Sequence, residues 1–237
     1  MNSAPATSID AAWLCGLLQA GDSFYPTGSY AHSFGLEGLV QEDVVRDLDT
    51  LRRYLFLSAL PALRRVELPI AAHAWRAFGK PDWPRVGELC RLASALKTAR
   101  EARAAAENIG RQRAELAAQL RRHPLAQEFL SRAATENWPC SPGISAALEG
   151  RALGAPLEAA LASVYYSSIA ALLAAAMKLL RIGQNACQGL LTEALAQAPA
   201  DIAAASETPL EEIGWFNPWL DIAAARHESA EARLFIS

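Results

Sequence analysis

The sequence has few of the patterns that mark catalytic or metal-binding proteins. Its four cysteines, Cys15, Cys90, Cys140 and Cys187, are far apart and form no CxxC pair, which argues against a zinc ribbon or a disulfide framework. None of the four histidines has another histidine three or four residues away, so no single helix presents a two-histidine metal face. Phosphate loops of the GxxxxGK[ST] type and the GxSxG and HExxH signatures are absent too.

The sequence also lacks a strong net charge, and its first residues predict no secretory signal. The formal net charge is -3, so no global basic field attracts nucleic acid or an anionic membrane. Residues 1–10 contain neither a basic stretch nor an apolar core, which argues against a secretory signal. The most apolar stretch, Ile169 to Met177, is too short to span a bilayer and is interpreted as a buried core helix. We expect a cytoplasmic protein.

The residues that are abundant favour helices. Alanine and leucine dominate a chain that is 52% apolar, and β-branched residues are few. Prolines, Pro61 and Pro69 among them, separate apolar segments of helical length, and no segment alternates like a strand. The sequence predicts an all-α, single-domain helical bundle of roughly ten helices over residues 1–237, with flexible ends at 1–8 and 228–237.

Local signals place several helix ends. Asp47 is predicted to cap a helix that begins at Leu48. Pro156 is predicted to begin the longest apolar helix, which ends near Arg181, and Gly183 to stop it in a left-handed conformation.

Three isolated residues are candidates for chemistry. His73 is interpreted as a half-buried packing histidine rather than a ligand. His123 precedes a proline at a helix boundary and is expected to cap the carbonyls of the preceding helix. Cys140 lies between two prolines, and an inert loop thiol is favoured over a reactive one because no basic group is near it in sequence.

One segment near the N-terminus, residues 20–37, is unusually specific, and we call it the N-terminal corner. It is predicted to leave one helix, turn at Pro26 and Gly28, and start a second helix. A helix–loop–helix turn explains most of this pattern. It does not explain the crowding of aromatic and imidazole side chains, which is typical of partner interfaces, at Phe24, Tyr25, Tyr30, His32 and Phe34.

The C-terminal tail is the second specific segment. Leu234, Phe235 and Ile236 follow Arg233 at the very end of the chain, where residues are usually weakly held. Because these side chains are apolar, we expect the tail to dock either on its own domain or on a partner. The residues alone leave both possibilities open.

Together these residues resemble the UreF family of urease accessory proteins. The family's N-terminal pattern is matched by Asp22-Ser23, Pro26, Gly28, Tyr30, His32-Ser33 and Gly35-Leu36-Glu37. Its C-terminal pattern is matched by Ala225 to Glu228, Arg233 to Phe235 and Ser237. Between them, Arg100-Glu101-x-Arg103 with Gly110-Arg111, and Met177 to Leu180 with Gly183-Gln184, match in the same order. Ile236 departs from the pattern because it stands where the family usually has a second arginine.

The resemblance implies an all-helical, cytoplasmic adaptor that is not an enzyme and needs no cofactor. Such a protein would bind the accessory protein UreD (UreH in some organisms) and the GTPase UreG, would support GTP-dependent nickel insertion into apo-urease through that complex, and would form a homodimer. The implied partner-binding residues are Tyr25, Pro26, Gly28, Tyr30, His32, Ser33, Glu37, Lys178, Gln184, Arg226, His227, Glu228, Arg233, Leu234 and Phe235.

Some roles stay open. Lys178 ends an apolar helix, where a cation also favours the helix dipole, so a capping role and a GTPase contact are both considered. His32 and His227 are weak candidates for nickel contacts, and structural hydrogen bonds are favoured for both. The tail is expected to dock on the UreD-type partner, folding as it binds. The alternatives to an adaptor are an independent nickel-binding chaperone and a helical enzyme whose site is not visible in sequence.

Overall fold

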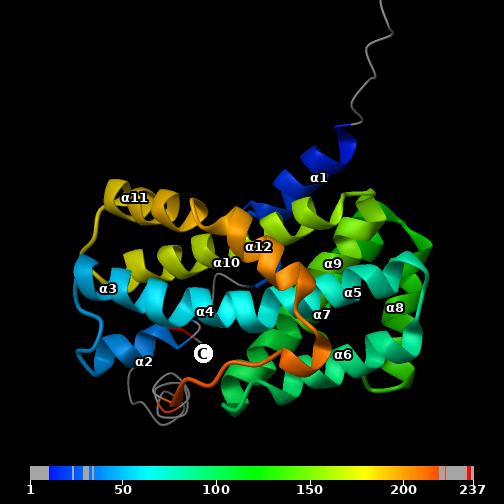
Figure 1. Ribbon diagram of the computed structural model, residues 1–237, viewed down its shortest axis with the longest axis horizontal. Coiled ribbons are helices and arrows are strands. Elements are labelled where there is room, and N and C mark those ends of the chain that lie inside the picture. The colour runs from blue at the N-terminus through cyan, green and yellow to red at the C-terminus, as the bar shows by residue number, and fades with distance from the viewer. Residues whose placement is uncertain are drawn as a thin grey trace, which may run out of the picture.

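The computed structural model describes residues 11–22, 24–28, 32–33, 35–218, 222 and 234–235, and none of these lies in a strand (Figure 1). The predicted all-α fold is therefore confirmed. The helices are α1 (Ala12–Gly21), α2 (Leu36–Gln41), α3 (Leu48–Tyr54), η2 (Leu55–Ala59), α4 (Leu60–Ala62), η3 (Leu63–Glu67), α5 (Leu68–Gly79), α6 (Trp83–Ala95), α7 (Arg100–Arg121), α8 (Pro124–Thr135), α9 (Pro142–Leu153), α10 (Leu157–Leu179), α11 (Gln184–Leu195), α12 (Ala198–Glu207) and η4 (Leu210–Glu212).

Helix α9 lies at the centre of the bundle. All eight residues from Gly143 to Gly150 are buried, because α5, α7 and α10 pack around this helix. Helix α7 comes so close that a Cβ on Gly110 would lie 2.6 Å from the backbone of Ser141. The Ser145 hydroxyl donates a hydrogen bond across this contact to the Gly110 carbonyl at 2.7 Å. A helix buried on every side must satisfy its polar side chains internally, and this requirement later decides the role of Glu149.

The helix from residue 48 to residue 79 runs through two prolines without a break (Figure 1). The prediction that Pro61 and Pro69 separate helices is therefore wrong. A proline ring clashes with the carbonyl four residues earlier in a regular helix, and here the wider π-helical turns η2 and η3 precede the two prolines. The Arg65 carbonyl, which Pro69 cannot bond, accepts a hydrogen bond from the Gly214 amide at 3.2 Å.

Other helix ends follow local chemistry. Asp47 caps α3 as predicted, and its side chain exchanges hydrogen bonds with Thr50 in a capping box. Gly183 is not a left-handed stop, because it has φ -78° and precedes α11 as its N-terminal flanking residue. His123 caps the helix that follows it rather than the one before, since its Nδ1 accepts the Leu125 amide hydrogen at 3.2 Å.

Helix α10 is longer than the apolar stretch that the sequence emphasised. It has 23 residues and a mean hydropathy of 1.6 over its most apolar window, so by length and composition alone it could cross a membrane. Half of that window is buried inside the protein, as in the core helix of a soluble protein. Tyr165 lies on its buried side and is completely enclosed.

Candidate partner-binding site

The main candidate site forms where the C-terminal tail meets helix α2. The Glu37 carboxylate accepts hydrogen bonds from two consecutive backbone amides, those of Leu234 at 2.6 Å and Phe235 at 3.1 Å. Lys178, in the last turn of α10, places its Nζ 5.0 Å from the centre of the Phe235 ring, which is a cation–π distance. We call Glu37, Lys178, Leu234 and Phe235 the tail site. It joins three segments that are far apart in sequence.

Local sequence explains why Glu37 is available at this position. Gly35 adopts the left-handed conformation with φ 84°, and α2 begins at the next residue. The Ser33 hydroxyl accepts the Glu37 amide hydrogen at 3.3 Å and so holds the first turn of α2. Leu36 and Leu39 anchor the helix in the core. The carboxylate is then held rigidly beside the tail, although the Glu37 residue is only 3% exposed.

The two tail residues differ in orientation. Phe235 is 4% exposed and packs on its own domain, whereas Leu234 is 63% exposed. The expectation that the apolar tail docks on a partner must therefore be corrected for Phe235, because its amide and its ring both bond within the chain. Leu234 remains available for an external contact.

The described part of the N-terminal corner has an exposed edge. Pro26 and Gly28 are exposed, and Gly28 has the positive φ of 78° that the sequence predicted. Phe24 is 92% exposed, and its amide donates to the Asp22 carboxylate at 2.6 Å, which closes the turn after α1. Phe24 thus exposes a large apolar ring at the edge of the corner, of the residue type enriched in protein interfaces.

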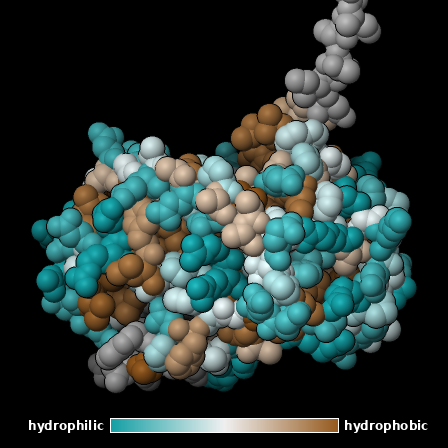
Figure 2. Space-filling model, in the orientation of Figure 1, coloured by the Kyte–Doolittle hydropathy of each residue, from teal (hydrophilic) through white to brown (hydrophobic). Residues whose placement is uncertain are grey.

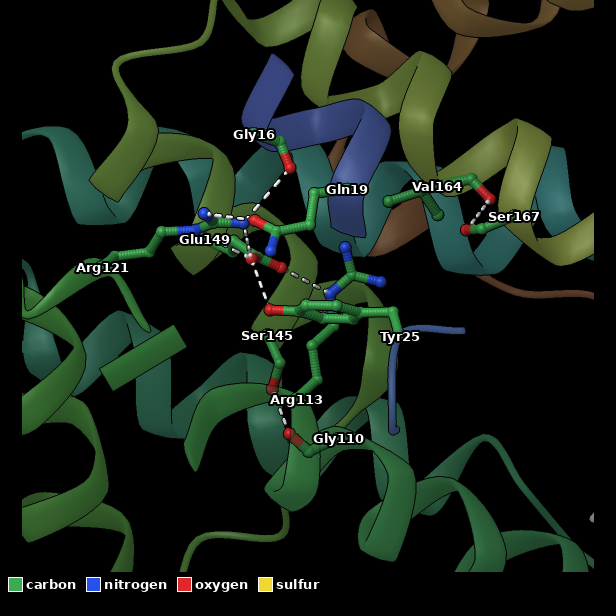
Figure 3. Close-up of polar contacts among 10 residues, drawn as sticks. All are labelled: Gly16, Gln19, Tyr25, Gly110, Arg113, Arg121, Ser145, Glu149, Val164 and Ser167. Atoms are coloured by element: carbon green, nitrogen blue, oxygen red, sulfur yellow. Dashed lines mark hydrogen bonds and ion pairs between the residues drawn. The ribbon is translucent and has the colours of Figure 1, made fainter. Parts of the chain in front are cut away.

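Tyr25 points the other way and is 8% exposed. Its hydroxyl donates a 2.8 Å hydrogen bond to Glu149 in the centre of the bundle (Figure 3). Burial, and next the negative charge of Glu149, raise the pKa of Tyr25 well above its ordinary value. Tyr25 is thus an internal anchor of the corner and does not face a partner directly.

Of the remaining predicted site residues, some are described by the structure and others are not. His32 and Ser33 are buried, and burial lowers the pKa of His32, while Gln184 is exposed at the start of α11. The predicted site residues Tyr30, Arg226, His227, Glu228 and Arg233 lie outside the described residues. Within the described part of the chain, no three His, Cys, Asp or Glu side chains are grouped as metal ligands would be.

The isolated histidine and cysteine candidates have structural surroundings. His73 is half-buried, as predicted, and its Nε2 lies 2.9 Å from the Thr208 carbonyl oxygen. Cys140 is 1% exposed, and burial raises the pKa of its thiol, which favours the inert form that the sequence suggested.

Sequence reasoning missed Glu149, a buried residue that contacts three side chains of the described chain. Glu149 contacts Arg113 and Arg121 as well as Tyr25. A signal did exist, since Glu149 is the one charged residue in the segment 144–150, and an ionisable residue that is buried there needs a partner. The identity of the partners could not be read from the sequence.

Comparison with known proteins identifies the family of this chain. The UreF family model matches residues 45–195, which is more than half of the chain. The chain belongs to the UreF family. It is 31% identical to the urease accessory protein UreF of Paenarthrobacter aurescens (strain TC1), over 97% of this chain and 100% of the relative. It is 29% identical to the protein of the same description from Bacillus sp. (strain TB-90), over 94% and 99% of the two chains.

Membership gives the coarse function of the molecule. The curated relatives are described as urease accessory proteins, so this chain belongs to a family of urease accessory proteins. The family match covers helices α3 to α11, while the tail site also uses α2 and the C-terminal residues outside that range.

Proposed function

We propose that this protein is a cytoplasmic, non-catalytic adaptor that binds the UreD/UreH accessory protein and the UreG GTPase, and so supports GTP-dependent nickel insertion into apo-urease. The observation that carries the proposal is the tail site, where Glu37, Lys178 and Phe235 meet. The buried contact of Glu37 with Phe235 holds the tail in place, so that the exposed side chains of Leu234 and Lys178 lie beside it and are available to a partner.

The two partners are assigned to different sets of exposed residues. The exposed side chains of Leu234 and Phe24 offer apolar contacts for UreD/UreH. Lys178 and Gln184, at the facing ends of α10 and α11, offer polar contacts for UreG. In this division the GTPase supplies the nucleotide chemistry and the adaptor supplies positioning. Nickel is the cargo of the assembly.

Co-purification from cells that express the urease gene cluster tests the adaptor. Tagged wild-type protein is expected to capture UreD/UreH and UreG. Lys178→Ala is expected to reduce UreG capture and spare UreD/UreH. Lys80→Ala is the matched control, because Lys80 is an exposed lysine that follows α5 at the opposite end of the molecule (Figure 1). If wild-type protein captured neither partner, the adaptor function would be refuted.

A homodimer is also part of this proposal, and the face formed by α1 and α10 supports it. Leu14 and Leu18, one turn apart on α1, are 45% and 67% exposed, and Tyr166 on α10 is 43% exposed. The Tyr166 ring lies beside the end of α1, 3.8 Å from the position of a Cβ on Gly21. Figure 2 shows an apolar patch on the protruding α1. A second copy of the chain would cover such a self-complementary helical face.

Light scattering after size-exclusion chromatography tests the dimer. Leu18→Glu is expected to yield a monomer, because it places a charge in the apolar contact. Leu57→Glu is the matched control, since Leu57 is also an exposed leucine (66%) but lies on η2. A dimer that persists in Leu18→Glu, or that dissociates equally in Leu57→Glu, would contradict this face as the interface.

A further inference from the structure

The centre of the bundle contains one completely buried carboxylate, that of Glu149 (Figure 3). Its Oε1 accepts hydrogen bonds from the Tyr25 hydroxyl at 2.8 Å and from Arg121 Nε and Nη2 at 3.2 and 3.0 Å. Its Oε2 lies 3.2 Å from Arg113 Nε, in an ion pair that lacks the alignment of a hydrogen bond. Three side chains thus converge on one acceptor group.

The charges in this cluster depend on each other. The Arg113 and Arg121 side chains are only 9% and 13% exposed, so water does little to solvate the two cations. Removing a buried partner of an ion pair leaves a charge without compensation, which is far more damaging than losing a surface pair. Glu149 is the anion that allows both arginines to lie here.

The partners of Glu149 belong to different segments. Arg113 and Arg121 both lie on α7, roughly 12 Å apart along its axis. Arg121 also donates to the Gly16 carbonyl at 3.2 Å and to the Gln19 side-chain oxygen at 2.8 Å, and both acceptors lie on α1. Through Arg121 the carboxylate therefore holds α1, and through Tyr25 it holds the N-terminal corner.

We infer that Glu149 is the positioning residue that holds α1 and the N-terminal corner in register with each other. One internal carboxylate then sets the geometry of two external surfaces, the apolar α1 face and the exposed edge of the corner. The part of this inference that concerns partner binding rests on the proposed adaptor function. The part that concerns positioning applies to the free chain.

The protein contains a matched control for Tyr25. Tyr165 is also a buried tyrosine, and its hydroxyl lies 3.2 Å from the Asp201 carboxylate and 3.0 Å from the Ala194 carbonyl oxygen. Asp201 pairs with Arg64 at 3.3 Å. This cluster joins α10, η3 and the α11–α12 region rather than the corner. Tyr165→Phe therefore removes the same kind of hydrogen bond as Tyr25→Phe from a different place.

Hydrogen exchange on the free full-length chain tests the positioning role. In Tyr25→Phe, amides of residues 24–28 are expected to exchange about tenfold faster, the change that corresponds to about 1.4 kcal/mol. In Arg121→Met, amides of α1 are expected to accelerate similarly. Tyr165→Phe should lower the melting temperature comparably and leave both regions unchanged. Unchanged exchange in Tyr25→Phe, or equal acceleration by Tyr165→Phe, would overturn the inference.

Partner binding provides the second readout. Tyr25→Phe is expected to weaken binding of purified UreD/UreH about tenfold, whereas Tyr165→Phe leaves the affinity unchanged. Equal affinities for wild type and Tyr25→Phe would overturn the claim that the cluster positions the binding surface. If wild-type protein bound neither accessory partner, the adaptor function would fail, while the exchange result would still decide whether Glu149 holds the corner and α1.

Discussion

Substituting Glu37 by glutamine should release the C-terminal tail. The carboxylate now accepts hydrogen bonds from the amides of both Leu234 and Phe235. A glutamine keeps one acceptor oxygen and replaces the other by an NH2 group, which would face a backbone N–H. One hydrogen bond to a charged group is lost, worth about 2 kcal/mol, so the docked tail should open about thirtyfold more often.

Hydrogen exchange of the peptide that contains Leu234 and Phe235 measures this opening directly. Glu37→Gln should accelerate its exchange about thirtyfold while the remaining helices keep their protection. Lys178→Met removes the cation above the Phe235 ring, and a partly exposed contact of this kind is worth about 0.5–1 kcal/mol. It should accelerate exchange by only about two- to fivefold.

Glu115→Gln on α7 is the control, because Glu115 is an exposed glutamate on another helix. It changes the net charge in the same way and should leave the tail unaffected. If Glu37→Gln left tail exchange at the wild-type rate, the two amide bonds would not hold the tail. If Glu115→Gln accelerated it equally, the cause would be net charge and not the Glu37 contact.

Three further predictions concern packing and titration. Gly110→Ala should destabilise the fold by about 1–3 kcal/mol in denaturant unfolding, because its Cβ would meet the backbone of Cys140 and Ser141 just before α9. Gly189→Ala, with open space around it, should instead stabilise α11 by about 0.5–1 kcal/mol. Iodoacetamide should modify the folded chain at exposed Cys15 alone, because burial raises the pKa of the other three thiols. Mass spectrometry measures the modified positions, and a second modified cysteine would contradict the prediction. Because the pKa of Tyr25 is raised above 10.0, the folded state holds the Tyr25 proton more tightly than the unfolded state does. Above about pH 10 the free energy of unfolding should therefore fall by up to 1.4 kcal/mol per pH unit on account of this residue. Tyr25→Phe should remove this part of the fall in unfolding free energy with pH. An identical fall in wild type and variant would contradict the prediction.

Much of the fold could be predicted from sequence because its causes are local. The abundance of alanine and leucine favours helix at every position. Asp47 finds its capping partner Thr50 only three residues away, and Gly28 adopts a positive φ that its own backbone permits. The unusual residues at both ends also marked two segments that meet in the folded chain, since the tail site contains Glu37 and Phe235 from those segments.

Tertiary structure decided the features whose partners are distant in sequence. Pro69 stays within a helix that widens to the π-helical turn η3 just before it, and Gly214, far along the chain, bonds the Arg65 carbonyl that Pro69 cannot. Tyr25 turns inward because Glu149 is buried and requires donors. The sequence by itself determined an all-helical chain with two specific ends. Only the folded chain decided which of those side chains face inward, because burial and hydrogen-bond satisfaction depend on what lies nearby in space.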